Sequence, residues 1–162
     1  MASAALRELQ LAVLPAAIGT IGVVYSNIVA MGIMGKVRYA EKSKEVHPYK
    51  PWADKSDSAE PHFRAFKACQ NCTEWTVYVL PVLWLYALYV PAIPVVGKFL
   101  PWSTSILGLA FGHFNTKYVE GYIVSAEGRL KPFYRRTLVM RCLFYGTLAG
   151  LASAGAAAFG LF

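Results

Sequence analysis

Charged residues are scarce in this chain of 162 residues: they make up 15% of it, against 56% hydrophobic residues. A soluble domain is typically about 25% charged and about 45–50% apolar, so a water-soluble globule would need an unusually apolar surface. Acidic residues are the scarcer kind, with 9 Asp and Glu against 16 Lys and Arg and a formal net charge of +7. Only three cysteines are present, which excludes a small secreted protein framed by disulfides.

Long stretches contain no charge at all. Four of them are 27, 23, 18 and 21 residues long and cover residues 9–35, 75–97, 99–116 and 142–162. Each reaches the roughly 18–20 residues that cross a bilayer core as a helix. We therefore predict one all-α integral membrane domain over residues 1–162, a bundle of four transmembrane helices. The helices are expected at about 9–35, 74–91, 99–124 and 133–160, with a polar cytoplasmic loop at about 36–66.

The basic residues cluster between these helices. Eight of the sixteen lie between the first and second helices, and four more lie between the third and fourth. The positive-inside rule places both connections in the cytoplasm. Topology therefore accounts for most of the basic excess, and we predict no nucleic-acid partner. Residues 41–62, which are rich in proline and mixed charge, predict an irregular surface loop.

Small residues recur at every fourth position of the last predicted helix, at Gly146, Gly150, Ala154 and Ala158. This spacing permits close approach of two helices in lipid. An alanine-rich helix that faces lipid is an equally good interpretation.

Three polar residues mark the start of the second helix. Lys67, Asn71 and Glu74 are spaced i, i+4, i+7, which places them within about 40° of one another on a helix. The plain structural interpretation is a Lys–Glu pair at the membrane boundary. Because ionisable residues at membrane depth are costly, the stripe is also a candidate site.

A second polar series follows on the third helix. Asn115, Tyr118, Tyr122 and Arg129 are spaced +3, +4 and +7, so they share a face if the helix continues past Gly128. Tyrosines are also common anchors at membrane interfaces, and an arginine can serve topology alone. Two complementary polar faces at one boundary favour a site for a small anionic polar ligand.

Other polar residues carry less specific signals. His113, Lys117 and Glu120 lie on the opposite face of the third helix; we expect Lys117 and Glu120 to neutralise each other and His113 to be hydrogen-bonded within the bundle. Cys69 and Cys72 form a C-x-x-C without a second pair or a nearby histidine, so we predict no metal site.

Two segments, FRAFKACQNCTEW followed by VLPVLW, and KYVEGYIVSAEGRL, resemble the signatures of the MAPEG family, the membrane-associated proteins in eicosanoid and glutathione metabolism. The resemblance is to the branch with microsomal glutathione transferase, leukotriene C synthase and 5-lipoxygenase-activating protein. It implies a homotrimer in the endoplasmic reticulum and nuclear envelope membranes, with glutathione as co-substrate bound near the cytoplasmic face. It also implies that Arg129 activates the sulfur and that Arg38, Asn71, Glu74, Tyr118 and Tyr122 hold glutathione. Lys67 is added to this binding set because its charge suits a glutathione carboxylate.

The function that this resemblance implies is conjugation of the glutathione thiolate to hydrophobic or lipid-derived electrophiles. Lipid-hydroperoxide peroxidase and leukotriene C synthase-like activities are variants of it. Lys67, Cys69, Trp75 and Asn115 depart from the family's enzymes, and Tyr39 stands where leukotriene C synthase has a second arginine, which favours general transferase activity. The alternative is a non-catalytic lipid-binding scaffold that resembles 5-lipoxygenase-activating protein, which lacks the arginine matched by Arg129.

Overall fold

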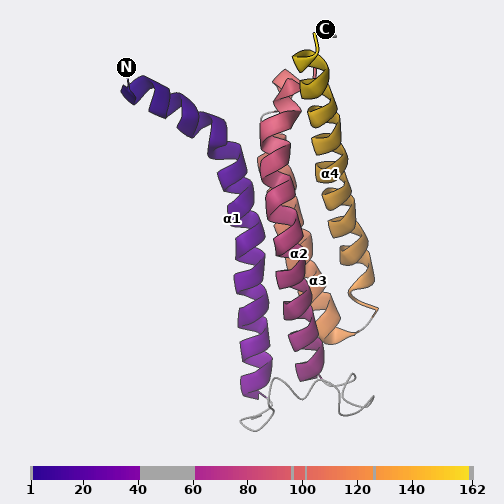
Figure 1. The fold of residues 1–162 in the computed structure, drawn as a ribbon. Coiled ribbons are helices and arrows are strands. Elements are labelled where there is room, and N and C mark those ends of the chain that lie inside the picture. The colour runs from indigo at the N-terminus through magenta and orange to yellow at the C-terminus, as the bar shows by residue number, and fades with distance from the viewer. Residues whose placement is uncertain (1, 41–60, 96, 101, 126, 161–162) are drawn as a thin grey trace.

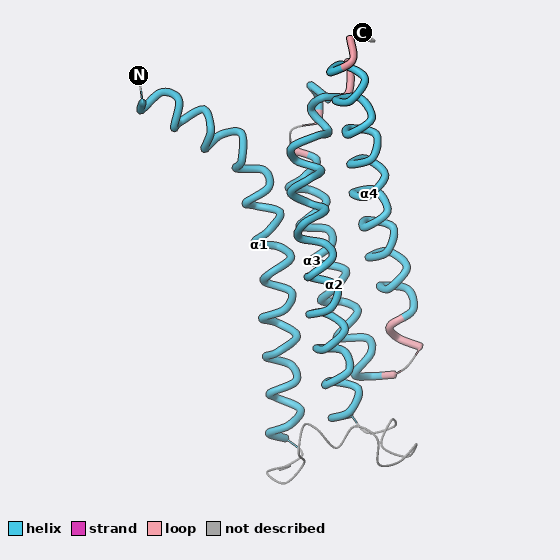
Figure 2. Tube along the Cα trace, viewed as in Figure 1, coloured by secondary structure: helices cyan, strands magenta, loops and turns pink. Residues whose placement is uncertain are grey.

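Four long helices make up the structure, a computed structural model that describes residues 2–40, 61–95, 97–100, 102–125 and 127–160. Two short 3₁₀ turns, η2 and η3, connect the second helix to the third (Figures 1 and 2). The elements are α1 Ala2–Ala40, α2 Pro61–Tyr89, η2 Val90–Ala92, η3 Gly97–Phe99, α3 Ser103–Val124 and α4 Leu130–Ala158. The all-helical prediction is confirmed for the described residues.

α1 and α2 are longer than predicted, whereas α3 begins at Ser103 instead of 99 and α4 spans Leu130–Ala158 instead of 133–160. α2 begins at Pro61, thirteen residues before the predicted start at 74, with the proline at the first helical position, where its missing N–H costs nothing. α1 extends beyond 9–35 at both ends. An absence of charge indicates the part of a helix that can sit in lipid, and a helix can continue into water. Residues 61–66 of the predicted loop are therefore helical, and residues 41–60 lie outside the described residues.

Three of the four helices are long and apolar enough to cross a membrane: Ala4–Val37, Phe63–Ala92 and Leu130–Ala158. α3 does not meet the same measure of length and composition within the described residues. Its second half carries Asn115, Lys117 and Glu120 among its apolar residues, which lowers its mean hydropathy. Large side chains such as Leu88, Phe144 and others on the bundle's outer surface are exposed, as in a protein whose surroundings are lipid.

Glycines bring α1 and α3 into backbone contact. A Cβ added to Gly108 would collide with the backbone of Gly19, and one added to Gly112 would collide with the carbonyl of Gly22. Such contacts let two helices pack closely without large side chains between them. Near its amino-terminus α1 leans away from the other helices (Figure 1), in the region that contains Pro15, a residue type that bends helices.

The predicted small residues of α4 serve the same purpose in part. Gly146 packs against the ring of Tyr86, and Gly150 packs against the backbone of Tyr89. Ala158, the last residue of the series, is exposed. Close packing of α4 on α2 is therefore confirmed for the first half of the series.

Two groups of buried apolar residues form the core. The larger one includes Val79, Leu83, Phe111 and Leu143. The smaller one includes Ala68, Cys72, Tyr118 and Val119 and lies at the end where α1 and α3 finish and α2 and α4 begin (Figure 2). This end, which we call the polar end, carries the candidate site.

Candidate functional site

A cavity of about 170 Å³ opens at the polar end. Three helices contribute its lining: Lys67, Gln70, Asn71 and Glu74 from α2, Tyr118 and Tyr122 from α3, and Arg129 from the start of α4. Six of the seven residues that the sequence singled out therefore line one cavity. Their proximity is an observation, and their roles in binding remain predictions.

The seventh predicted residue is Arg38. It lies near the carboxyl end of α1, the end of that helix that reaches the polar end of the bundle (Figure 1). Its side chain lies outside the described residues, so its part in the site stays a prediction.

The α2 face of the cavity is a relay of hydrogen bonds. Lys67 Nζ donates to Gln70 Oε1 at 3.2 Å, and Gln70 Nε2 donates to Glu74 Oε1 at 3.0 Å. Lys67 and Glu74 are thus joined through an amide, which holds both charged groups on the face that also carries Asn71. Gln70 was missed in the sequence, although its place three residues after Lys67 puts it on the same stripe.

The α3 face presents two tyrosines whose rings are in contact at a tilt of 48°. The ring centroids of Tyr118 and Tyr122 are 5.8 Å apart, and Tyr118 is buried while Tyr122 is half-buried. Arg129 Cζ lies 4.4 Å from the centroid of the Tyr122 ring, within the range of a cation–π contact. The guanidinium of Arg129 and the two phenol rings therefore line the same small cavity.

Arg129 reaches this place by a different route from the one predicted. α3 ends at Val124 instead of continuing past Gly128, and Arg129 is the residue that caps the start of α4. The condition under which all four polar residues would share one α3 face, a helix that continues past Gly128, is therefore not met for Arg129. The chain reverses within a few residues, and the arginine returns over the tyrosines from the neighbouring helix.

Two glycines make that reversal possible. A Cβ on Gly121 would collide with the carbonyl oxygen of Gly128, and one on Gly128 would lie 2.5 Å from the carbonyl oxygen of Gly121. Ser125 N–H donates to Gly121 O at 3.0 Å, and Gly128 N–H donates to Ser125 Oγ at 2.9 Å. These two hydrogen bonds stabilise both ends of the turn, and they therefore fix the position of Arg129 at the start of α4.

Arg136 is a further polar residue at this end, and its place among the basic residues between the third and fourth helices predicted only a role in topology. Its side chain is 0% exposed. Nη1 donates to Asn115 Oδ1 at 2.6 Å and Nη2 donates to Asn71 Oδ1 at 3.2 Å. Arg136 lies seven residues after Arg129, two helical turns along the same face, and that spacing was the available signal.

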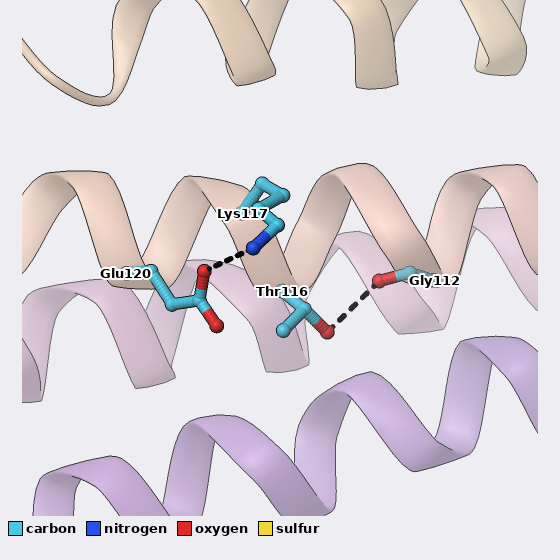
Figure 3. A network of polar contacts seen from close by, with 4 residues as sticks. All are labelled: Gly112, Thr116, Lys117 and Glu120. Atoms are coloured by element: carbon cyan, nitrogen blue, oxygen red, sulfur yellow. Dashed lines mark hydrogen bonds and ion pairs between the residues drawn. The ribbon is translucent and has the colours of Figure 1, made fainter.

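The opposite face of α3 carries the predicted ion pair. Lys117 Nζ donates to Glu120 Oε2 at 2.8 Å (Figure 3), so the neutralising pair is confirmed. The prediction for His113 is wrong: the residue is exposed, and its ring packs edge-on against Phe114 at 5.4 Å. With Lys117 it lines a separate basic cavity of about 280 Å³ between α3 and α4.

The cysteines are free thiols, with Cys72 buried and Cys142 exposed. Among the described residues, no group of three or more His, Cys, Asp or Glu side chains could hold a metal ion. The site's polar groups are instead cations, amides and phenols, with Glu74 as the one carboxylate of the cavity lining, a set suited to an anion with hydrogen-bonding groups.

The fold is that of a helical membrane protein with a polar cavity at one end of the bundle. The sequence model of the MAPEG family matches residues 16–157, which is most of the chain, and the protein belongs to that family. A search of curated proteins gives no significant match. The family includes both glutathione transferases and scaffold proteins. Membership alone therefore does not decide the activity, and the geometry of the site is the basis for proposing one.

Proposed function

We propose that the protein is a glutathione transferase of the membrane, which conjugates the glutathione thiolate to hydrophobic or lipid-derived electrophiles. The observation that carries this proposal is the position of Arg129, which lines the cavity together with the polar residues of α2 and the two tyrosines of α3. The same chemistry extends to reduction of lipid hydroperoxides: the thiolate attacks a peroxide oxygen, the O–O bond breaks to release the lipid alcohol, and a second glutathione converts the resulting sulfenic acid to glutathione disulfide and water.

The cavity lining suits the groups of the tripeptide. Glutathione carries two carboxylates and one ammonium. Lys67, together with Arg38 by resemblance, is assigned to the carboxylates, and Glu74 is assigned to the ammonium. Asn71 and the tyrosine hydroxyls supply directional hydrogen bonds.

Arg129 is assigned to the sulfur. A free thiol has a pKa of about 8.5, so only a few per cent is ionised at pH 7. Lowering that pKa by about two units requires roughly 2.7 kcal/mol of preferential stabilisation of the thiolate. A guanidinium within hydrogen-bonding reach supplies this order of energy in a half-buried site, and it keeps its charge when desolvated.

The size of the cavity supports an assembly of several chains. At about 170 Å³ it is smaller than the roughly 300–1,000 Å³ of most ligand pockets, so a tripeptide would extend beyond the surface that one chain provides. We propose that neighbouring subunits of a homotrimer complete the site. We also propose an endoplasmic reticulum location with the polar end toward the cytoplasm, because the basic connections lie at that end.

Binding and turnover in Arg129→Ala test the assignment. We expect purified protein to bind glutathione in calorimetry, and we expect the variant to lose at least about 100-fold in kcat while its Kd for glutathione rises less than about tenfold, since the lost contact acts mainly on the developing thiolate. Arg135→Ala is the matched control, because Arg135 is exposed and lies near Phe114 on another face.

Unchanged turnover in Arg129→Ala would remove that residue from the mechanism. A wild-type protein that fails to bind glutathione but binds a fatty acid specifically would instead support the scaffold alternative.

A further inference from the structure

Arg136 is a buried cation that has no carboxylate partner among the described residues. Its side chain is fully buried, and no acidic group lies within ion-pair distance of it among the residues that the structure describes. Burial of a charge costs free energy unless partners compensate for the lost water. An ionisable residue kept at this depth in a membrane protein is therefore a candidate for a function.

Its hydrogen bonds lead to the candidate site. The guanidinium donates to the amide oxygens of Asn115 on α3 and of Asn71 on α2, and Asn115 Nδ2 donates to Ser26 Oγ on α1 at 2.9 Å. Arg136 Nε has no hydrogen-bond partner among the described residues. The network thus joins all four helices, and one of its ends, Asn71, is a lining residue of the cavity.

Its aromatic contacts lead to the same wall. Arg136 Cζ lies 4.2 Å from the ring centroid of Tyr118 and 4.7 Å from that of Trp75. The ring of Tyr118 in turn contacts that of Tyr122, and Arg129 lies over the Tyr122 ring. Two guanidiniums therefore flank the two tyrosines of the cavity, one beside the cavity and the other behind its wall.

We propose that Arg136 is a positioning residue of the candidate site: from behind the wall it holds Asn71 and Tyr118 in place and adds a positive potential that favours an anion in the cavity. The identity of that anion, the glutathione thiolate, rests on the proposed function. Because no carboxylate of the described part of the chain lies close enough to cancel its charge, the field of Arg136 extends over several ångströms in a medium of low dielectric constant.

Other charged and titratable groups among the described residues also contribute to the electrostatic potential in the cavity. Lys67 and Arg129 add positive charge to the cavity and Glu74 adds negative charge, while Tyr122 contributes a phenol. Cys72 on α2 and Tyr118 on α3 are the titratable groups within electrostatic reach of Arg136 itself, and α1 contributes Ser26 through Asn115.

The first experiment titrates the thiolate absorbance of glutathione bound to the purified protein. In Arg136→Gln we expect the thiol pKa to rise by about one unit, because a nearby positive charge is lost. Arg136→Lys should restore the wild-type value because it keeps the charge, and should bind glutathione about fivefold more weakly because it cannot reach both amides. The matched control is Arg135→Gln, which removes an equal charge from the adjacent exposed residue and should change neither quantity.

A second experiment does not depend on glutathione. Gln70→Cys places a reporter thiol on an exposed residue of the cavity lining. Its alkylation by iodoacetamide is followed against pH, and fragment ions in tandem mass spectrometry separate it from Cys69 and Cys72, which lie on the same peptide. Adding Arg136→Gln should raise the apparent pKa of the reporter by about half a unit, whereas adding Arg135→Gln should leave it unchanged.

The two experiments separate the two proposals. A reporter that responds to Arg136→Gln in a protein that binds no glutathione would support the role of Arg136 and overturn the proposed function. Folded Arg136→Gln protein with unchanged reporter and glutathione titrations would show that Arg136 serves the fold alone. Arg136→Leu is a second neutral variant for the same measurements, because apolar residues often replace buried charges without loss of stability.

Discussion

The two halves of the helical bundle are held together in different ways. In the half that contains Gly19 and Gly108, α1 and α3 meet at their backbones and apolar side chains fill the space around them. At the polar end the same helices are joined through Ser26 and Asn115, and the network continues to the buried guanidinium of Arg136. Backbone contact dominates the first half, where one buried hydrogen bond, from Ser105 Oγ to Pro15 O at 2.8 Å, also joins α3 to α1. At the polar end a hydrogen-bond network around a buried charge joins all four helices.

The two ways of joining the helices differ in what they contribute to stability and to function. Close packing of glycines needs no polar group and places no chemistry between the helices. A buried arginine is an expensive way to join helices that apolar contacts could join. The half that contains this network also carries the cavity lined by Lys67, Asn71 and Arg129. We therefore propose that the reaction takes place in this half.

The largest effect is expected from Asn115→Leu, which removes the closest partner of the buried Arg136 guanidinium. Leaving a buried charge short of a partner costs about 3–5 kcal/mol, and the bond to Ser26 is lost as well. Unfolding of the purified protein in detergent, followed by circular dichroism, measures the change. A loss below about 1 kcal/mol would mean that the network contributes little to the fold.

A smaller effect of steric origin is expected in the other half. Gly108→Ala forces a methyl group against the backbone of Gly19 and should destabilise the protein by about 1–3 kcal/mol. Gly155→Ala is the control, because a Cβ there meets nothing within 4 Å, and it should stabilise α4 by up to about 1 kcal/mol through helix propensity. Equal effects of the two substitutions would contradict the backbone contact.

Gly121→Ala tests the link between the turn and the site. The added methyl group collides with the carbonyl of Gly128 and should displace Arg129, which follows directly. We expect kcat to fall at least about tenfold, because small displacements of a catalytic group are costly, while unfolding shifts by less than about 2 kcal/mol. Gly35→Ala, at an open position of α1, should keep full turnover; a similar loss there would point to a general effect.

The smallest effect is expected from Glu120→Gln, which breaks the exposed ion pair with Lys117. Exposed pairs contribute roughly 0–1 kcal/mol, so both the unfolding transition and turnover should stay close to the wild type. A large loss of turnover would show that this face of α3 takes part in the reaction.

The sequence predicted the features that depend on local spacing. The order of the four helices followed from uncharged runs, and Lys67, Asn71 and Glu74 followed from helical periodicity, as did Tyr118 and Tyr122. These residues lie within continuous helices, so their shared faces do not depend on how the helices pack.

Features that depend on tertiary packing were not predictable in the same way. Arg135 and Arg136 are adjacent and chemically identical, yet one is exposed and the other fully buried, because the phase of α4 against α2 and α3 decides which one turns inward. The path of Arg129 depends on backbone contact between Gly121 and Gly128, and His113 is exposed because α3 presents that face outward.

The proposed function depends above all on ionisation of a thiol in this cavity through Arg129. Titration of the thiolate absorbance of glutathione bound to the wild type and to Arg129→Gln tests it most directly. We predict a thiol pKa about two units below that of free glutathione in the wild type and a return most of the way to the free value in the variant. A bound thiol with the pKa of free glutathione in the wild-type protein, or an unchanged low value in Arg129→Gln, would contradict the claim.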